Sequence, residues 1–210
     1  MDLGESKNIF YFSEEGIKNL EKTIELVHER ALDLGLKKVL IFTANGDGAF
    51  AAHEKFNKDN IRILAVTFPY KKEFKITNTD GEKNTIIPQT SMQKIKNMLS
   101  EKEIDLIQGV MPFEDILLPG VKDTKIQTLN YTLSLLSGGT RLCIQSVLMA
   151  CDSGYIDPGE YVISMSADTA MVLRACRTEW LFHPKYGLEI SEIICKPSKF
   201  TIIHNRSEQK

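Results

Sequence analysis

The sequence predicts a single α/β domain built on a mostly parallel sheet that helices cover on both faces. Short apolar runs of strand length, such as residues 39–42, alternate along the chain with segments whose apolar residues recur at helical spacing. This alternation favours parallel strands buried on both faces. The 210 residues suffice for one large domain, which we favour over two small ones. We assign residues 1–204 to the domain and residues 205–210 to a polar C-terminal tail.

The composition narrows the classes of partner. Hydrophobic residues make up 42% of the chain and charged residues 26%, which is ordinary for a globular protein. A formal net charge of −2 favours neither nucleic acid nor an anionic membrane as partner. No apolar run approaches the roughly 20 residues of a membrane span, and the first residues do not resemble a secretory signal. We therefore expect a cytoplasmic protein.

Helical segments are predicted from capping residues and apolar periodicity. Ser13, Glu14 and Glu15 are typical of a helix start, and Gly35 of a helix end. A second helix is predicted to begin near Asp47, and a third to run from about Thr90 to Glu101. Two more helices are predicted to meet at residues 137–140, and a short one to run from Asp168 through Val172.

Five apolar segments are predicted to be strands of the sheet: residues 37–43, 61–67, 104–107, 161–165 and 189–195. Residues 200–203 are a candidate edge strand. Residues 74–77 and 84–87 flank Thr79-Asp80-Gly81, which suggests a hairpin, although an irregular excursion is the alternative. Residues 111–120 are expected to form a loop with one helical turn.

A glycine-bearing loop follows the first predicted strand. Residues 46–51, Gly-Asp-Gly-Ala-Phe-Ala, match G-x-G-x-x-A, a permitted form of the dinucleotide fingerprint. The fingerprint also needs an acid about twenty residues further on, and residues 66–68 contain none. Neither a P-loop nor a G-x-S-x-G motif is present. The loop and helix start could hold a phosphate, or could form a tight turn that binds nothing.

Three longer stretches together resemble a known family. They are residues 11–46, residues 149–173 (MACDSGYIDPGEYVISMSADTAMVL) and residues 189–197 (EISEIICKP). They are similar to stand-alone prokaryotic proteins with the fold of the pyruvate kinase C-terminal domain. The resemblance implies a three-layer α/β/α domain with a five-stranded sheet in the order 3-2-1-4-5, whose last strand is antiparallel.

The resemblance also implies a ligand site. In open α/β sheets ligands bind at the carboxyl ends of strands where the strand order reverses, here between the first and fourth strands. The family implies flavin mononucleotide (FMN) as cofactor, no pyruvate kinase activity because the catalytic barrel is absent, and a possible homodimer. The expected cofactor-binding residues are Thr43, Ala44, Asn45, Gly46, Asp47, Gly48, Ala49, Thr67, Ser164, Ser166, Asp168 and Thr169.

Two positions differ from the pattern of that family. It usually has threonine or serine near Asp47, where a carboxylate would repel a phosphate at a cost of about 1 kcal/mol when both are solvated. It also usually has a glycine-rich stretch before Ala167, where this chain has Ser164-Met165-Ser166. Both differences bear on whether the cofactor binds.

Several residues keep two interpretations. Thr43 either donates its hydroxyl to phosphate or only ends a strand, and Asn45 either orients a ligand or forms an Asx-turn. Asp168 either binds a ribityl hydroxyl or caps a helix. Residues 137–141 either bind an anion, with Arg141 as the charge, or form a plain turn between helices.

Aromatic residues and cysteines add little evidence for catalysis. Trp180 and Phe182 could stack on an isoalloxazine ring, pack on a dimer surface or pack in the core, and the core is favoured. The four cysteines are expected to be buried thiols, although Cys176 lies between Arg174 and Arg177, which could lower its pKa. No nucleophile can be paired with a base.

The sequence therefore favours a protein that binds a phosphorylated small molecule, most simply FMN. A flavin-dependent oxidoreductase and a ligand-free structural or regulatory protein are the alternatives.

Overall fold

A seven-stranded sheet forms the centre of the protein. The computed structural model describes residues 4–77, 83–114 and 124–201, and every structural statement concerns these residues. The strand order is β1-β9-β8-β7-β2-β3-β6, and all neighbours are parallel except β8, which is antiparallel to β7 and β9. The strands are β1 (Phe10–Phe12), β2 (Lys38–Phe42), β3 (Arg62–Thr67), β6 (Asp105–Gln108), β7 (Tyr161–Met165), β8 (Ala170–Arg174) and β9 (Glu189–Pro197).

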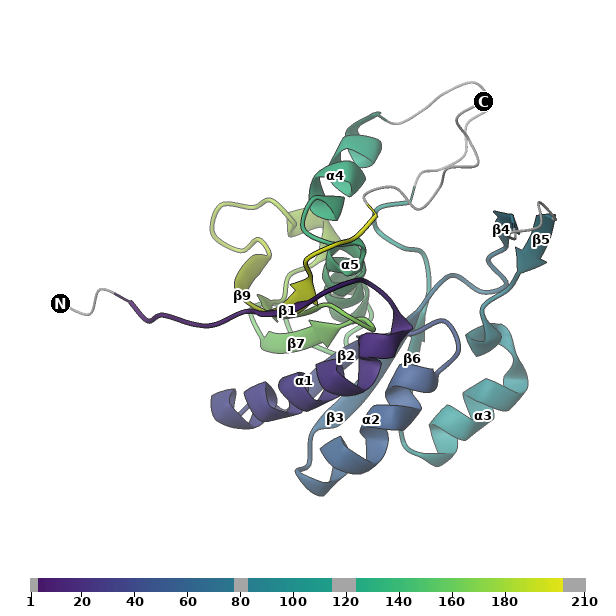
Figure 1. The fold of residues 1–210 in the computed structure, drawn as a ribbon, viewed down its shortest axis with the longest axis horizontal. Helices are drawn as coiled ribbons and strands as arrows, with labels where there is room; N and C mark the ends of the chain where they lie inside the picture. Colours follow the sequence, from purple (N-terminus) through teal and green to yellow (C-terminus); the bar gives the residue numbers. More distant parts are fainter. Residues whose placement is uncertain (1–3, 78–82, 115–123, 202–210) are drawn as a thin grey trace.

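Helices cover both faces of this sheet, so the predicted α/β class is confirmed (Figure 1). Helices α1, α2 and α3 pack on one face, whereas α5, with α4 against it, packs on the other. The helices are α1 (Leu20–Leu34), α2 (Asp47–Lys58), α3 (Gln93–Glu101), α4 (Thr124–Ser134) and α5 (Gly138–Asp152), with short 3-10 turns η1 (Ile17–Asn19), η2 (Gln89–Ser91) and η3 (Thr178–Trp180).

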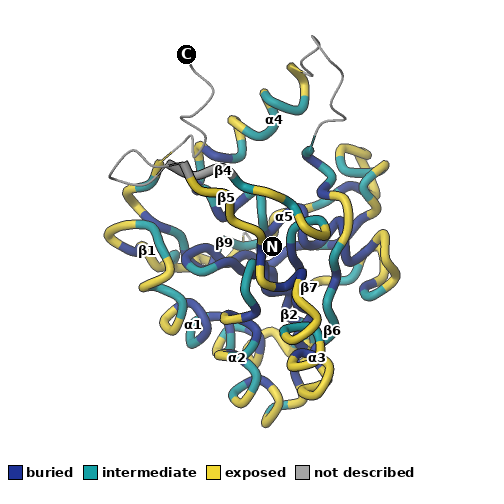
Figure 2. Tube along the Cα trace, turned by 90° about the vertical axis from the view of Figure 1, so that its right-hand side faces the viewer, coloured by how far each residue is buried: buried dark blue, intermediate teal, exposed yellow. Residues whose placement is uncertain are grey.

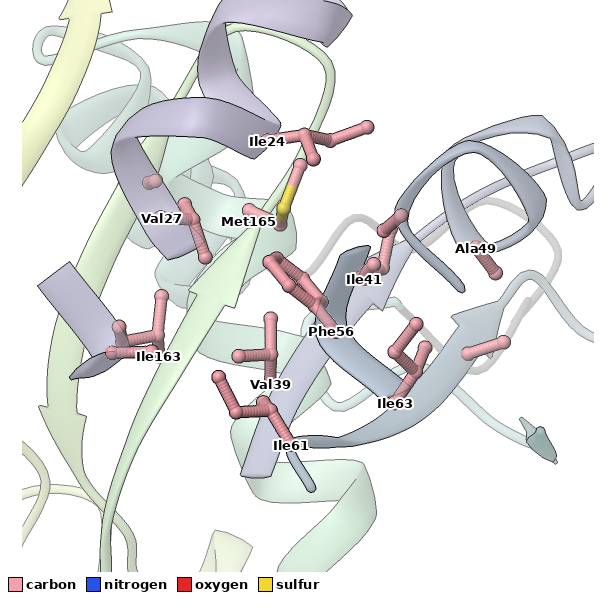
Figure 3. Close-up of a cluster of buried hydrophobic side chains, with 14 of the residues drawn as sticks. Ile24, Val27, Val39, Ile41, Ala49, Phe56, Ile61, Ile63, Ile163 and Met165 are labelled. Carbon is pink, nitrogen blue, oxygen red and sulfur yellow. The ribbon is translucent and has the colours of Figure 1, made fainter. Parts of the chain in front are cut away.

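Alternate side chains of each central strand enter the two hydrophobic cores, because successive residues of a strand point to opposite faces. Val39 and Ile41 pack with Phe56 on the face covered by α1, α2 and α3 (Figure 3). Leu40 and Phe42 pack on the opposite face, against α5. This two-sided burial explains why residues 39–42 are a continuous apolar run rather than an alternating one.

The position of β8 corrects the predicted five-strand sheet. Four of the predicted strands keep the order 3-2-1-4, but β8 separates β7 from β9, and β9 is not antiparallel to β7. The helix predicted from Asp168 through Val172 is therefore wrong. The Ser166 N–H donates to the Thr169 carbonyl at 2.8 Å, which closes a tight turn and directs residues 170–174 back along β7.

The chain also enters the fold differently from the prediction. Residues 10–12 form β1, which pairs in parallel with β9, and α1 starts at Leu20 rather than near Ser13. The backbone of Gly16 has φ of 125°, a conformation that suits glycine and not a helix. The N–H of Glu15 donates to the Lys199 carbonyl, so this segment is bound to the end of β9.

The remaining expectations differ in outcome. The hairpin is confirmed, with β4 (Phe74–Thr77) antiparallel to β5 (Lys83–Ile86). The helix predicted from Thr90 begins at Gln93, after η2. Residues 200–201 are in no strand, whereas residues 115–120, 202–203 and the tail at 205–210 lie outside the described residues.

Helix α4 is mostly exposed or half-buried. Ser134 is its buried residue, and the helix lies at the rim of the molecule in Figure 2. No single helix in the described ranges has the length and apolar character needed to cross a membrane. Helices α4 and α5 meet that criterion only when they are taken together, and they are bent by 118°.

Candidate functional site

The carboxyl ends of the parallel strands bring the predicted site segments to one edge of the sheet. Strands β2, β3 and β7 are adjacent and parallel, so Thr43, Thr67 and Ser166 all lie at or just beyond this carboxyl edge. Helices α2 and α5 begin at the same edge, since α2 leaves β2 directly and α5 leads back to β7. The two predicted loops are therefore neighbours, as the strand-end rule requires.

One hydroxyl group and one glycine determine the conformation of the loop from β2 to α2. Thr43 extends the strand pairing, because its N–H donates to the Val66 carbonyl at 2.9 Å. Its Oγ1 accepts the Gly46 N–H at 2.9 Å, so this hydroxyl shapes the turn. Gly46 has φ of 88°, and a Cβ there would lie 2.7 Å from the Phe50 ring. Glycine is therefore required at this position.

The first turn of α2 presents backbone N–H groups at this edge. Within the described residues, the N–H groups of Asp47, Gly48 and Ala49 have no acceptor. Helix N-termini with free N–H groups attract anions through those groups and the helix dipole. The Asp47 side chain is exposed and stands at the entrance to this turn. It supplies a carboxylate where a phosphate would approach.

Thr90 supports the same loop, although the sequence did not indicate it. Its N–H and its Oγ1 both donate to the Ala44 carbonyl, at 3.1 and 3.0 Å. Thr67 Oγ1 lies 2.7 Å from Thr90 Oγ1 in a buried pair. Thr67 thus braces the loop through Thr90. Asn45 makes no side-chain hydrogen bond within the described residues, so the Asx-turn is not formed.

In the loop between β7 and β8 the side chains of Asp168 and Thr169 are hydrogen-bonded within the protein. Asp168 is 9% exposed, and its carboxylate accepts the Gly16 N–H at 2.7 Å and the Thr169 hydroxyl at 3.0 Å. The Thr169 hydroxyl also lies 2.9 Å from Ser137 Oγ. Asp168 therefore fixes the segment before α1 and does not cap a helix.

The two serines of β7 and its turn are also enclosed. Ser164 is fully buried, and its hydroxyl has no hydrogen-bond partner among the described residues. The hydroxyl of Ser166 has no hydrogen-bond partner and faces Gly139 in α5. A Cβ at Gly139 would meet this hydroxyl and would lie 2.6 Å from Thr169 Cβ. The first turn of α5 thus packs tightly against the β7–β8 turn.

The segment between α4 and α5 is a capped turn. Ser137 Oγ accepts the Thr140 N–H at 3.1 Å, which satisfies one of the free donors at the start of α5. Arg141 lies in the first turn of this helix.

Trp180 and Phe182 lie at the opposite edge of the sheet. They follow β8, whose antiparallel direction carries the chain to the amino ends of β7 and β2. Phe182 is 78% exposed, so the expectation that it packs in the core is wrong. Both residues are too far along the strand direction to line the β2–α2 loop.

The cysteines are free and buried, as the sequence indicated. Burial raises the pKa of Cys176, so the lowered pKa expected from Arg174 and Arg177 is wrong. No group of three or more histidine, cysteine, aspartate or glutamate side chains in the described ranges is placed to hold a metal ion.

Two grooves lie away from the two loops. One of about 690 Å³ runs between the carboxyl ends of α2 and α3, with His53 and Lys96 among its lining residues. Another of about 300 Å³ lies beside β1 and includes Arg30 and Glu192. Neither is lined by a residue of the predicted cofactor site.

No known family model matches this chain. The resemblance to the pyruvate kinase C-terminal domain therefore stays a prediction.

Proposed function

We propose that the protein binds a phosphorylated small molecule, with FMN as the expected cofactor, at the start of α2. The observation that carries this proposal is the set of three N–H groups, from Asp47, Gly48 and Ala49, that have no acceptor within the described residues. Such groups at a helix N-terminus bind phosphate oxygens through hydrogen bonds and the helix dipole.

The shape of the loop supports a phosphate at this place. Gly46 adopts the left-handed conformation that turns the chain sharply, and Gly48 lets α2 lie close to β2, since a Cβ there would lie 3.0 Å from Ile41 Cγ2. Thr43 and Thr90 hold the loop by hydrogen bonds, so little ordering would accompany binding. The phosphate end of FMN thus fits the residues present.

The rest of the cofactor finds less support. Asp168 and Thr169 already use their side-chain groups within the protein, and Ser164 is fully buried. In the proposed complex the phosphate is held by the β2–α2 loop, while Asp168 and Thr169 position the neighbouring turn. Bound FMN would supply electron-transfer chemistry, for which the flavin-dependent oxidoreductase remains the alternative function.

A ligand-free structural or regulatory protein is the second alternative. It is favoured by the closed hydrogen bonding of the β7–β8 turn and by the Asp47 carboxylate at the mouth of the loop. Under this alternative Asp47 faces solvent at the start of α2, while Gly48 and Ala49 are buried behind it.

The test is the visible absorption spectrum of the purified protein after FMN is added and the mixture is desalted. We expect the protein to retain flavin. We also expect its affinity for riboflavin, which lacks the phosphate, to be weaker than its affinity for FMN by about tenfold or more. Equal affinity for FMN and riboflavin would place the phosphate elsewhere. A colourless protein after both steps would exclude stable flavin binding.

A charge variant tests the place of the phosphate directly. Asp47→Thr removes the repelling carboxylate and should tighten FMN several-fold. Glu54→Gln is the matched control, because it removes one exposed negative charge from the same helix away from its N-terminus. An equal effect of both substitutions would indicate a general charge effect, and unchanged affinity for Asp47→Thr would argue against this loop.

A further inference from the structure

Arg141 differs from the other arginines of the described structure in having no carboxylate partner. Ion pairs form between Arg30 and Glu192, Arg62 and Asp105, Arg174 and Glu189, and Arg177 and Glu179. Within the described ranges no carboxylate lies within 4.0 Å of the Arg141 guanidinium, and no acceptor bonds to it. A guanidinium group withdrawn from water is normally paired.

The position of Arg141 places it at the carboxyl edge of the sheet. Arg141 and Gln145 lie four residues apart, so they share one side of α5. Gln145 Oε1 accepts the Phe113 N–H at 2.9 Å, which brings this side of the helix against the segment that follows β6. Arg141 is one turn nearer the start of α5 and therefore nearer the edge where β2, β3 and β6 end.

The nearest acid is shared with a second cation. Glu114 interacts electrostatically with Arg141, but its carboxylate accepts a hydrogen bond from Lys72 Nζ. Lys72 and Glu114 are 35% and 32% exposed, so this group is open to solvent. Two cations thus share one carboxylate, and the group formed by Lys72, Glu114 and Arg141 has a net charge of +1.

The position of Arg141 in α5 does not stabilise its positive charge. It lies in the first turn of α5, where the positive end of the helix dipole disfavours a cation. Arg141 is half-buried, and this burial lowers its pKa. A bound anion would offset both the unfavourable helix dipole and the burial of the charge.

We propose that Arg141 and Lys72 form an anion-binding subsite that takes the oxyanion of a small molecule, either a phosphate or a carboxylate. This subsite lies on the α5 face of the sheet and is separate from the free N–H groups of α2. It does not depend on FMN being the cofactor. Planar guanidinium groups bind both oxyanions through paired N–H donors.

The experiment is a two-dimensional ¹H–¹⁵N NMR titration of the whole chain with sodium phosphate, and in parallel with malonate. We expect the Arg141 Nε–H signal to shift and to reach a plateau as the anion concentration rises. The probe that binds with the higher affinity identifies the class of oxyanion. The Arg141→Gln variant should weaken this binding about tenfold or more. The absence of a saturable shift at Arg141 with both probes would overturn the proposal.

Two further variants make the outcome specific. Glu114→Gln removes the competing carboxylate and should tighten the anion several-fold, whereas unchanged affinity would contradict the shared-carboxylate argument. Arg62→Gln is the matched control, since Arg62 is paired and lies at the other end of β3. Shifts at the amides of residues 46–49 report the α2 site separately, so either proposal can fail alone.

Discussion

At the scale of single residues, Gly46 determines the shape of the β2–α2 loop. Its φ of 88° turns the chain, its N–H donates to Thr43 Oγ1, and its α-carbon lies against the Phe50 ring. This turn leads directly into the first turn of α2, where the N–H groups of Asp47, Gly48 and Ala49 have no acceptor within the described residues.

We expect Gly46→Ala to destabilise the protein by about 2–3 kcal/mol, measured by urea unfolding. Roughly 1 kcal/mol comes from the left-handed backbone, and the rest from the contact of the new Cβ with Phe50. Gly154→Ala is the matched control, because Gly154 has φ of 76° but nothing within 4 Å of its Cβ position. Equal losses of stability in the two variants would show that the Phe50 ring moves aside without a measurable cost.

Residues of this loop could be predicted from sequence, but their long-range partners could not. The glycines and Thr43 lie within one local motif, and their spacing indicates a turn before a helix. Thr90 bonds to Ala44 across 46 residues, and Gly16 bonds to Asp168 across 152. No local pattern encodes such contacts, because they depend on the order of strands in the sheet.

At the scale of secondary structure, β8 shows where local propensity misleads. Ala170, Met171 and Leu173 are good helix formers, and Asp168 is a good helix cap. The segment nevertheless forms a strand, because the turn at Ser166 and Thr169 places it between β7 and β9. Tertiary pairing overrides the intrinsic preference. The strands β2 and β3, which are buried on both faces, are predicted more easily because residues 39–42 and 63–66 are continuous apolar runs.

The contact between α5 and the β7–β8 turn gives a prediction at this scale. Gly139→Ala should destabilise the protein by about 2–3 kcal/mol in urea unfolding, because its Cβ would enter the space of Ser166 Oγ and Thr169. Glycine to alanine inside a helix is otherwise stabilising by about 0.5–1 kcal/mol, so the sign itself is informative.

The double variant Gly139→Ala with Ser166→Gly should recover part of that loss, since it removes the hydroxyl that the new Cβ meets. Ser166→Gly alone is the reference for the cycle. Strictly additive losses would mean that the clash lies elsewhere.

At the scale of the whole molecule, one sheet separates two hydrophobic cores, and buried thiols lie in both. Cys195 packs with α1 on one face, and Cys151 belongs to α5 on the other. Burial raises the pKa of Cys195 to about 12 and that of Cys151 to about 11. The alternation of strands and helices predicted this layered arrangement, but not the side on which each helix packs.

These thiols predict a loss of stability in alkali. A thiol whose pKa is raised in the folded state stabilises the protein fully below the unfolded pKa of about 8.5. That contribution disappears as the pH rises toward the folded values. The free energy of unfolding, measured in urea between pH 7 and pH 11, should therefore fall above about pH 9.

The Cys195→Ala variant provides the comparison. It should be less stable at neutral pH because a small cavity remains, yet it should lose less additional stability as the pH rises. A decline parallel to that of the unchanged protein would mean that other groups cause the alkaline loss.

The pairing of β1 with β9 has a consequence for synthesis on the ribosome. Phe10 lies opposite Cys195, so β1 has to wait for the much later translation of β9 before its hydrogen bonds can form. The nascent chain can assemble β2, β3 and β6 earlier, while residues 10–12 and the segment leading to α1 stay unanchored. Contacts of such long sequence separation slow folding. Closure of this edge is therefore expected to be a late step of folding.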